Sequence, residues 1–251
     1  MKRKILDIAM AVLFLTGVAC SVFFGLVPSA KEAGTGMAET DNEYASRSAD
    51  KNGAGTWENI TVVLDPGHGG SDPGKVGVND SLEKDINLSI SLMAGELLEE
   101  KGFNVVYTRQ DGNGLYSESD VNKKAADMRK RCELIEDAGA DVVVSIHQNS
   151  YTDPDVCGAQ VFYYTHSAQG KIFAEIMQQS LKDNVNSGNK RTCKANDSYY
   201  LLIHTPCPTI IVECGFLSNP AEEKLLNDED YQSKIAQAIL EGVENYFSAG
   251  G

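Results

Sequence analysis

Four side chains suited to metal binding or acid–base chemistry stand at the ends of apolar segments in this sequence. His68 lies in the glycine-rich stretch VVLDPGHGGSDPGKVG, just after an apolar run, and His147 ends a second apolar run in VVVSIHQNS. Glu83 opens the helical pattern that follows His68, and Glu213 ends the apolar run TIIV. Catalytic zinc takes three ligands from His, Asp or Glu and leaves a fourth position for water. The set therefore indicates a zinc hydrolase.

Each of these residues also has a simpler explanation. A single loop histidine is most often a hydrogen-bonded loop residue, but two such positions among only four histidines exceed the background. A carboxylate in the first turn of a helix is favoured by the helix dipole and by a cap from Ser81, so spacing alone does not select Glu83. Glu213 is harder to explain, because a buried carboxylate without a partner is costly. Its alternative is a salt bridge with Arg109 or Arg131.

Strand-like and helical segments alternate along the part of the chain that carries these residues. Short β-branched runs predict buried strands at 60–64, 104–108, 141–146, 159–164 and 209–213. Helical patterns predict helices at 82–101, 122–138, 168–186 and 230–247. The alternation implies a single α/β domain with a twisted, mostly parallel sheet flanked by helices. Ligands in such folds collect at the carboxyl ends of the strands, where His68 and His147 stand.

The amino-terminal segment differs in composition from the rest. Three basic residues at 2–4 precede an apolar run over 5–27, which is long enough to cross a bilayer as a helix. Residues 1–30 are predicted to be a signal peptide or membrane anchor, with an uncleaved anchor favoured and the remainder on the outer side. Residues 31–58 have hardly any aliphatic side chain and are predicted to be a disordered linker. The catalytic domain is assigned to 59–248.

The net charge and the cysteine content of the chain limit which partners it can bind and which disulfide bridges it can form. The net charge of -14 and pI near 4.7 argue against nucleic-acid binding, which needs clustered Lys and Arg. Cys20 is expected to pack in lipid, which leaves an odd number of cysteines at irregular spacing: Cys132, Cys157, Cys193, Cys207 and Cys214. This pattern describes no disulfide framework, and no CxxC pair suggests a structural zinc. Buried thiols or a single bridge are both compatible with it.

Four motifs occur in a fixed order: LDPGHGGSDPG, SLEKDINLS, VVVSIHQNS and VECGFLSNPAEEKLL. They resemble the successive motifs of the zinc-dependent N-acetylmuramoyl-L-alanine amidases of the type-3 amidase family, which cut peptidoglycan. The resemblance covers about residues 60–247. It implies that one Zn²⁺ is bound by His68, Glu83 and His147, and that Glu213 is the catalytic carboxylate. It also implies a sheet of about six strands, and the sixth strand is expected within 198–203.

A compact domain behind an amino-terminal anchor, without wall-binding repeats, is most similar to the germination-specific amidases of endospore formers. This implies hydrolysis of the bond between N-acetylmuramic acid and L-alanine in spore-cortex peptidoglycan, by a protein attached to the membrane through its amino-terminal helix. The protein would be exported, and either anchored to the outer face of the membrane or secreted to the cell wall or forespore intermembrane space. Alternatives are a zinc carboxypeptidase acting on stem peptides and a non-catalytic peptidoglycan-binding module. The need for an accessory protein stays open.

Five further residues near these motifs carry lesser predictions. Asp65 is expected either to accept the free imidazole proton of a ligand histidine or to cap its own turn. Arg131 is expected either to contact substrate carboxylates or to face solvent. Asn149 is expected to serve its own turn, and His204 to be structural or substrate-lining. Cys214 is expected to be buried rather than nucleophilic, since no adjacent histidine activates it.

Overall fold

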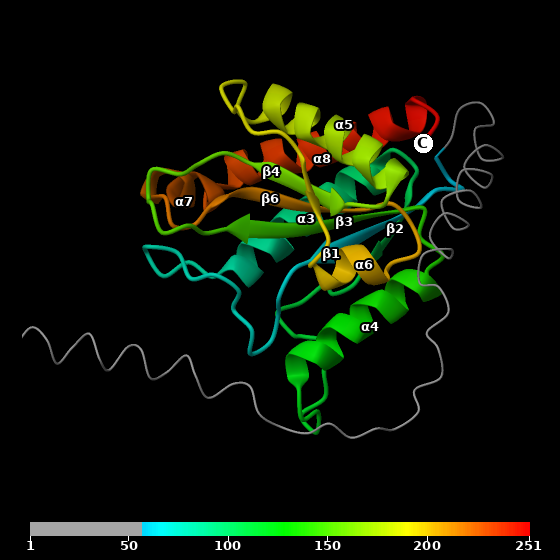
Figure 1. Ribbon diagram of the computed structural model, residues 1–251, viewed down its shortest axis with the longest axis horizontal. Coiled ribbons are helices and arrows are strands. Elements are labelled where there is room, and N and C mark those ends of the chain that lie inside the picture. The colour runs from blue at the N-terminus through cyan, green and yellow to red at the C-terminus, as the bar shows by residue number, and fades with distance from the viewer. Residues whose placement is uncertain (1–56) are drawn as a thin grey trace, which may run out of the picture. The chain divides into compact units, whose positions relative to one another are not determined.

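A computed structural model describes residues 57–251 (Figure 1). The predicted signal peptide or anchor at 1–30, Cys20 and nearly all of the predicted linker lie outside these residues. Among residues 57–251, every helix is too short or too polar to cross a bilayer.

A six-stranded sheet forms the centre of the described domain (Figure 1). Its strands are β1 (Thr61–Pro66), β2 (Asn104–Tyr107), β3 (Val142–Asn149), β4 (Gln160–Tyr164), β5 (Lys194–Asn196) and β6 (Thr209–Phe216). Their order across the sheet is β2-β1-β3-β6-β4-β5. Neighbouring strands are parallel except β4 and β6, which are antiparallel. The predicted single α/β domain with a mostly parallel sheet is confirmed.

Helices cover both faces of this sheet (Figure 1). Three of them pack on one face: α3 (Glu83–Glu100), α5 (Ala168–Asn184) and α8 (Glu229–Ser248). On the other face lie α4 (Lys123–Asp137) and the short α6 (Tyr200–His204). A further short helix, α7 (Pro220–Leu226), follows β6.

The apolar runs of the strands serve both faces at once. In β1, Val62 and Leu64 belong to the large core beneath α3, α5 and α8, whereas Val63 packs with Ile135 of α4 on the opposite face. Side chains alternate between the faces of a strand, so a sheet covered twice needs an uninterrupted apolar run. This explains why the central strands were predictable from the sequence.

The prediction of a sixth strand within 198–203 is wrong. These residues contribute to helix α6, and the sixth strand is β5, which runs parallel to β4. Leu201 and Leu202 supply the apolar character of the segment, and both are buried because α6 presents them to two separate clusters. The edge strand β5 covers no core and reads Lys-Ala-Asn, so it carries no apolar pattern.

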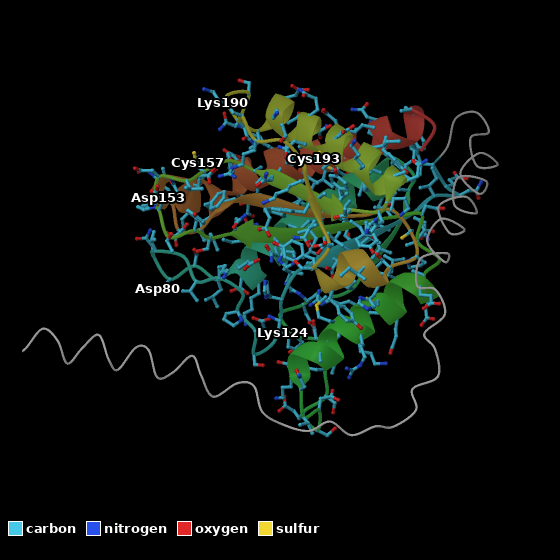
Figure 2. The ribbon with its side chains drawn as sticks, viewed as in Figure 1. Asp80, Lys124, Asp153, Cys157, Lys190 and Cys193 are labelled. Carbon is cyan, nitrogen blue, oxygen red and sulfur yellow. The ribbon has the colours of Figure 1, made fainter. Side chains whose placement is uncertain are left out.

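The cysteines of the described domain are all free thiols, including the exposed Cys157 and the half-buried Cys193, which lie apart from each other (Figure 2). No disulfide bridge therefore forms among residues 57–251. Cys214 is fully buried, as predicted, and its burial raises the pKa of the thiol well above its usual range.

A buried ion pair connects α4 to the sheet. Nη1 of Arg131 lies 2.6 Å from Oδ1 of Asp65, and both side chains are only 2% exposed. Asp65 also accepts hydrogen bonds from the hydroxyls of Ser145 in β3 and Thr108 after β2. The carboxylate thus joins α4 to three strands, and the predicted roles of Asp65, as imidazole acceptor or turn cap, are wrong. Arg131 does not face solvent.

The ion pair between Asp65 and Arg131 should make the stability of the fold depend on pH in the acid range. Burial raises the pKa of Asp65, but the charge of Arg131 and three hydrogen bonds outweigh it and lower the pKa to about 2. Because the folded-state pKa is depressed, the stabilisation is complete above about pH 4 and is lost as the pH falls towards 2, which amounts to about 2 kcal/mol. We expect Asp65→Asn to remove this acid-dependent loss. At pH 7 the same variant should be less stable by about 3 kcal/mol, since Arg131 loses its buried partner and keeps only the more exposed Asp127.

Urea unfolding of both proteins at pH 7 and pH 3 measures these effects. Asp137→Asn, which changes an exposed carboxylate on the same helix, serves as the control and should behave like the wild type. Equal stability of wild type and Asp65→Asn at pH 7 would show that the ion pair does not stabilise the fold.

Candidate metal centre

The turn after β1 places His68 in an uncommon backbone conformation. Its φ is 64°, and the two glycines that follow also have positive φ. A non-glycine residue in this region costs on the order of 1–3 kcal/mol, so its surroundings must hold it. The guanidinium of Arg109 donates to the carbonyl oxygens of Pro66 and Gly67, each at 2.9 Å, and Arg131 donates to the carbonyl oxygen of His68. Two buried arginines therefore fix the turn that carries the first histidine.

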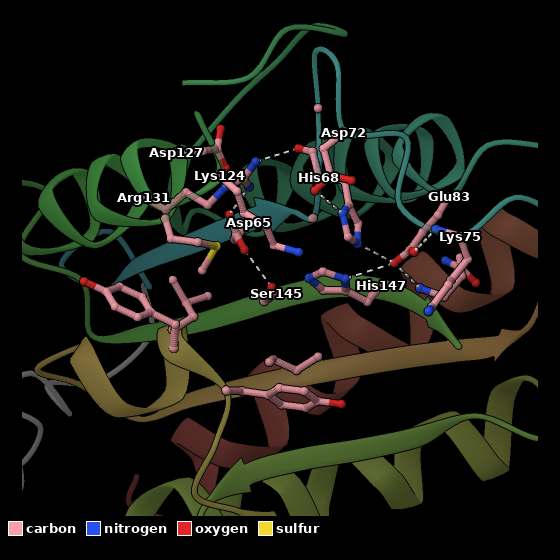
Figure 3. Close-up of a pocket in the computed structure, with 18 of the residues that line it drawn as sticks. Asp65, His68, Asp72, Lys75, Glu83, Lys124, Asp127, Arg131, Ser145 and His147 are labelled. Carbon is pink, nitrogen blue, oxygen red and sulfur yellow. Dashed lines mark hydrogen bonds and ion pairs between the residues drawn. The ribbon is translucent and has the colours of Figure 1, made fainter. Parts of the chain in front are cut away.

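The structure brings the three predicted zinc ligands together (Figure 3). Oε1 of Glu83 lies 3.1 Å from Nε2 of His68 and 3.0 Å from Nδ1 of His147. One ligand atom from each residue falls within 4.8 Å of the other two. Glu83 is buried, whereas both imidazoles are about one-fifth exposed towards a cavity. Two imidazoles and one carboxylate with an open side are the donor set of a catalytic zinc site.

Asp72 fixes the orientation of the first imidazole. The Nδ1 atom of His68 lies 2.9 Å from Oδ2 of Asp72, which leaves Nε2 facing Glu83. A histidine ligand commonly donates its second N–H to a carboxylate in this way. This role was predicted for Asp65 as one alternative, and Asp72 was missed, although Asp72 stands four residues after His68 in the same glycine-rich turn. The residues present therefore fit a divalent metal such as zinc.

Glu83 owes its position to more than the helix that it begins. Leu82 is the N-cap of α3 and provides no side-chain cap, while the hydroxyl of Ser81 donates to Glu223. The alternative in which Ser81 caps the helix is therefore wrong. Backbone N–H groups of Lys75 and Gln148 donate to the Glu83 carboxylate at 2.6 Å and 3.1 Å. Burial alone raises the pKa of Glu83, but the bonds to the two histidines outweigh it and keep the pKa well below its usual range.

Glu213 lies in β6, where it pairs directly with His147 of the neighbouring strand β3. The side chain is 8% exposed, and its Oε2 atom has no hydrogen-bond partner among the described residues. Burial raises the pKa of Glu213 to about 7, although the charge of His147 opposes the rise. The alternative of a salt bridge with Arg109 or Arg131 is wrong, since both arginines bind the turn after β1. An ionisable group with a strongly shifted pKa in a cavity is a candidate for proton transfer.

A cavity of about 820 Å³ connects these groups to the surface. The three candidate ligands and Glu213 line it, together with residues of α4 and α6. Asn149 lines it as well, but its side-chain oxygen accepts from the N–H of Ser150, so the prediction that it serves its own turn is confirmed. His204 does not line the cavity. Its Nδ1 atom bonds the carbonyl oxygen of Tyr200 and its ring stacks on the ring of Tyr200, which confirms the structural alternative.

Gly67 provides a test of the site geometry that does not depend on activity. A Cβ atom at this position would collide with the imidazole of His147, which is bonded to Glu83. We expect Gly67→Ala to displace the His147 ring and to weaken zinc binding by about tenfold or more. Titration with zinc in competition with a chelator measures the affinity.

Gly112→Ala is the matched control, because a Cβ atom there meets nothing within 4 Å. An unchanged zinc affinity in Gly67→Ala would show that the position of the His147 ring does not determine metal binding.

Comparison with known proteins places the chain in a family. A model of the Amidase_3 family, described as N-acetylmuramoyl-L-alanine amidase, matches residues 62–245. The germination-specific N-acetylmuramoyl-L-alanine amidase of Bacillus subtilis (strain 168) is 37% identical over 193 residues, which are 76% of this chain and 81% of that protein.

Two solved structures are similar to the described domain. The CwlD amidase from Clostridioides difficile, solved in complex with the GerS lipoprotein, is 41% identical with a TM-score of 0.74 and covers 76% of this chain and 100% of that one. The catalytic domain of CwlV, an N-acetylmuramoyl-L-alanine amidase from Bacillus (Paenibacillus) polymyxa var. colistinus, is 30% identical with a TM-score of 0.67, covering 75% of this chain and 98% of that one. The chain belongs to the Amidase_3 family of N-acetylmuramoyl-L-alanine amidases.

Proposed function

We propose that this protein hydrolyses the amide bond between N-acetylmuramic acid and L-alanine in peptidoglycan. One Zn²⁺ is held by His68, Glu83 and His147, and Glu213 transfers the proton. The observation that carries the proposal is the pairing of a three-residue metal centre with one buried carboxylate that lacks a partner, both lining the same cavity. Membership of the amidase family supports the choice of bond.

The donor set supports zinc rather than a harder cation. Two imidazole nitrogens and one carboxylate suit Zn²⁺, whereas Mg²⁺ and Ca²⁺ prefer oxygen ligands. When bound, zinc lowers the pKa of its water to about 7 and polarises the carbonyl of the amide.

The residues of the chain have distinct roles in the proposed reaction. Asp72 holds the Nδ1 proton of His68 and thereby keeps the Nε2 lone pair available as a ligand. The Glu213 carboxylate accepts a proton from the attacking water and then donates it to the departing amine of L-alanine. A general acid–base group works best when its pKa is near the working pH, and burial raises the pKa of Glu213 in that direction.

The similarity to the germination-specific amidase of Bacillus subtilis supports spore-cortex peptidoglycan as the substrate. For an exported enzyme of this kind, residues 1–30 serve as signal or membrane anchor, 31–58 as linker and 59–248 as catalytic domain. The protein then acts at the outer face of the membrane, in the cell wall or in the forespore intermembrane space. The complex of the Clostridioides difficile relative with a lipoprotein supports a comparable accessory partner for this chain.

The role of Glu213 can be separated from metal binding. We expect Glu213→Gln to retain one zinc and to lose at least about a hundredfold in hydrolysis, because the amide cannot accept the proton. Mass spectrometry of digested muropeptides measures the loss and identifies the bond. Free lactyl groups on muramic acid indicate an amidase, and loss of terminal D-alanine indicates the carboxypeptidase alternative.

Glu175→Gln, which changes an exposed carboxylate of α5, is the matched control and should keep full activity. Undiminished hydrolysis by Glu213→Gln would remove Glu213 from the mechanism. Peptidoglycan binding without hydrolysis by the zinc-loaded wild type would favour the non-catalytic binding module.

Metal analysis tests the ligand set directly. We expect one zinc per wild-type chain and a loss of bound zinc in both His68→Ala and His147→Ala, since each removes one of three ligands. His204→Ala, in which the changed histidine lies outside the cavity lining, should keep its zinc. Zinc that survives either ligand substitution would show that the proposed set is wrong.

A further inference from the structure

Asn87 is a fully buried amide on the face of α3 that packs against the sheet. It stands one helical turn after Glu83, and the buried face continues with the apolar side chains of Ile90, Ala94 and Leu98. An asparagine favours a helix interior less than a leucine does, and burying its amide is costly unless hydrogen bonds replace those to water. An aliphatic residue would fill the core at this position, so the amide must be explained by its contacts.

The two ends of the Asn87 side chain contact the segments that carry the candidate metal ligands. Its Nδ2 atom donates to the carbonyl oxygen of Gly67 at 3.1 Å and lies 3.5 Å from Oε1 of Glu83. Its Oδ1 atom accepts from Nε2 of Gln148 at 3.2 Å. In the sequence, Gly67 precedes the first ligand, Glu83 is the second, and Gln148 follows the third. One side chain therefore touches all three ligand-bearing segments.

The contacts among Asn87, Glu83 and Gln148 form a closed ring. The backbone N–H of Gln148 donates to the same Oε1 atom of Glu83 at 3.1 Å, and the Gln148 side chain is buried. Because a backbone carbonyl can only accept, the carbonyl of Gly67 requires that Nδ2 of Asn87 faces it, which turns Oδ1 towards Gln148. The amide therefore has one orientation, with a donor on one side and an acceptor on the other.

The need of the Gly67 carbonyl for a donor does not by itself explain Asn87. That oxygen already accepts from Nη2 of Arg109 at 2.9 Å, so it would stay bonded if the Asn87 amide were removed. What would change is the freedom of the Gly67 backbone to move. This backbone approaches the imidazole of His147 so closely that a Cβ atom would collide with the ring. A shift of Gly67 therefore changes the position of His147 as well as that of His68.

We propose that Asn87 is a positioning residue of the metal centre, whose amide holds Gly67, Glu83 and Gln148 and so keeps the three ligands at the spacing that one zinc ion needs. The inference rests on the proposed function, in which these ligands bind zinc. Asn87 is not itself a ligand, since it does not line the cavity. It acts through the segments that it joins.

Replacing Asn87 by leucine, which has nearly the same shape and no polar atom, tests this role. We expect Asn87→Leu to weaken zinc binding by about tenfold to a hundredfold, because residues that hydrogen-bond metal ligands contribute this much to affinity. Titration of the full chain with zinc, in competition with a chelator, measures the affinity. Co²⁺ in place of zinc gives a second measurement, since its visible absorption bands depend on ligand geometry, and these bands should differ from those of the wild type.

Gln178→Met is the matched control for the loss of a buried amide. Gln178 of α5 is also buried, bonds the backbone of Ala159 and Val161, and does not line the cavity. This variant should keep the zinc affinity and the cobalt spectrum of the wild type. Urea unfolding of the metal-free proteins measures what each substitution costs the fold.

Gln148→Met tests the same contacts from the other side and decides the matter if Asn87→Leu does not fold. It removes the donor to Oδ1 of Asn87 but keeps the backbone N–H that bonds Glu83, so it should weaken zinc binding more than the control does and less than Asn87→Leu. Wild-type zinc affinity in Asn87→Leu would overturn the proposal, as would wild-type affinity in Gln148→Met if the first variant does not fold. An equal loss of affinity in Gln178→Met would also overturn it, since the effect would then follow general destabilisation.

The same measurements separate this inference from the proposed function. A wild type that binds one zinc but does not hydrolyse the muramoyl amide would contradict the proposed function, while weaker zinc binding by Asn87→Leu would still support the positioning role. A wild type that binds no zinc would overturn both.

Discussion

The candidate site depends on one buried oxygen atom, Oε1 of Glu83, which faces ring nitrogens of two histidines, one in the turn after β1 and one in β3. A buried carboxylate is costly unless positive or hydrogen-bonding groups surround it. The imidazoles of His68 and His147 and two backbone N–H groups meet this requirement. The same arrangement fixes both rings at the separation that a single cation needs. The contacts that stabilise the buried charge of Glu83 are therefore the same contacts that set the geometry of the metal centre.

Glu83 and Glu213 show how two environments give one residue type two chemical roles. Glu83 is surrounded by donors, so its pKa is depressed and it stays ionised as a ligand. Glu213 is buried at the end of an apolar strand and has one oxygen without a partner, so its pKa is raised. Paired carboxylates whose pKa values are moved apart in this way can divide ligand and proton-transfer roles between them. Glu213 breaks the usual pairing of buried charges, as functional residues often do.

The central strands and the polar residues His68, His147 and Glu213 at their ends leave strong local signals in the sequence, whereas Glu83 was selected only through the resemblance to the amidase family. Strands β1, β3 and β6 are covered on both faces and read as continuous apolar runs, and polar residues at their ends are conspicuous. The edge strand β5 has no such signal because it covers no core, and α6 was mistaken for a strand because two adjacent leucines face different clusters. The imidazole-acceptor role was predicted for Asp65 as one alternative, and Asp72 was missed, because the choice depends on where Arg131 reaches, a contact across 66 positions from Asp65. Such long-range partners leave no pattern in a single sequence.

The order of the strands has a consequence for how the protein can change. Pro66 of β1 pairs with Ile146 of β3, and the next residue of β3, His147, pairs with Glu213 of β6, so His147 and Glu213 face each other across two strands and His68 follows the neighbouring strand. Backbone hydrogen bonds hold neighbouring strands about 4.8 Å apart, whatever the side chains are. The cavity wall contributed by α6 takes no part in this pairing, whereas α4 supplies Arg131, which holds the turn that carries His68. The reacting distances thus depend on the main chain and on Arg131, and the wall formed by α6 can be remodelled for a different polymer without disturbing them.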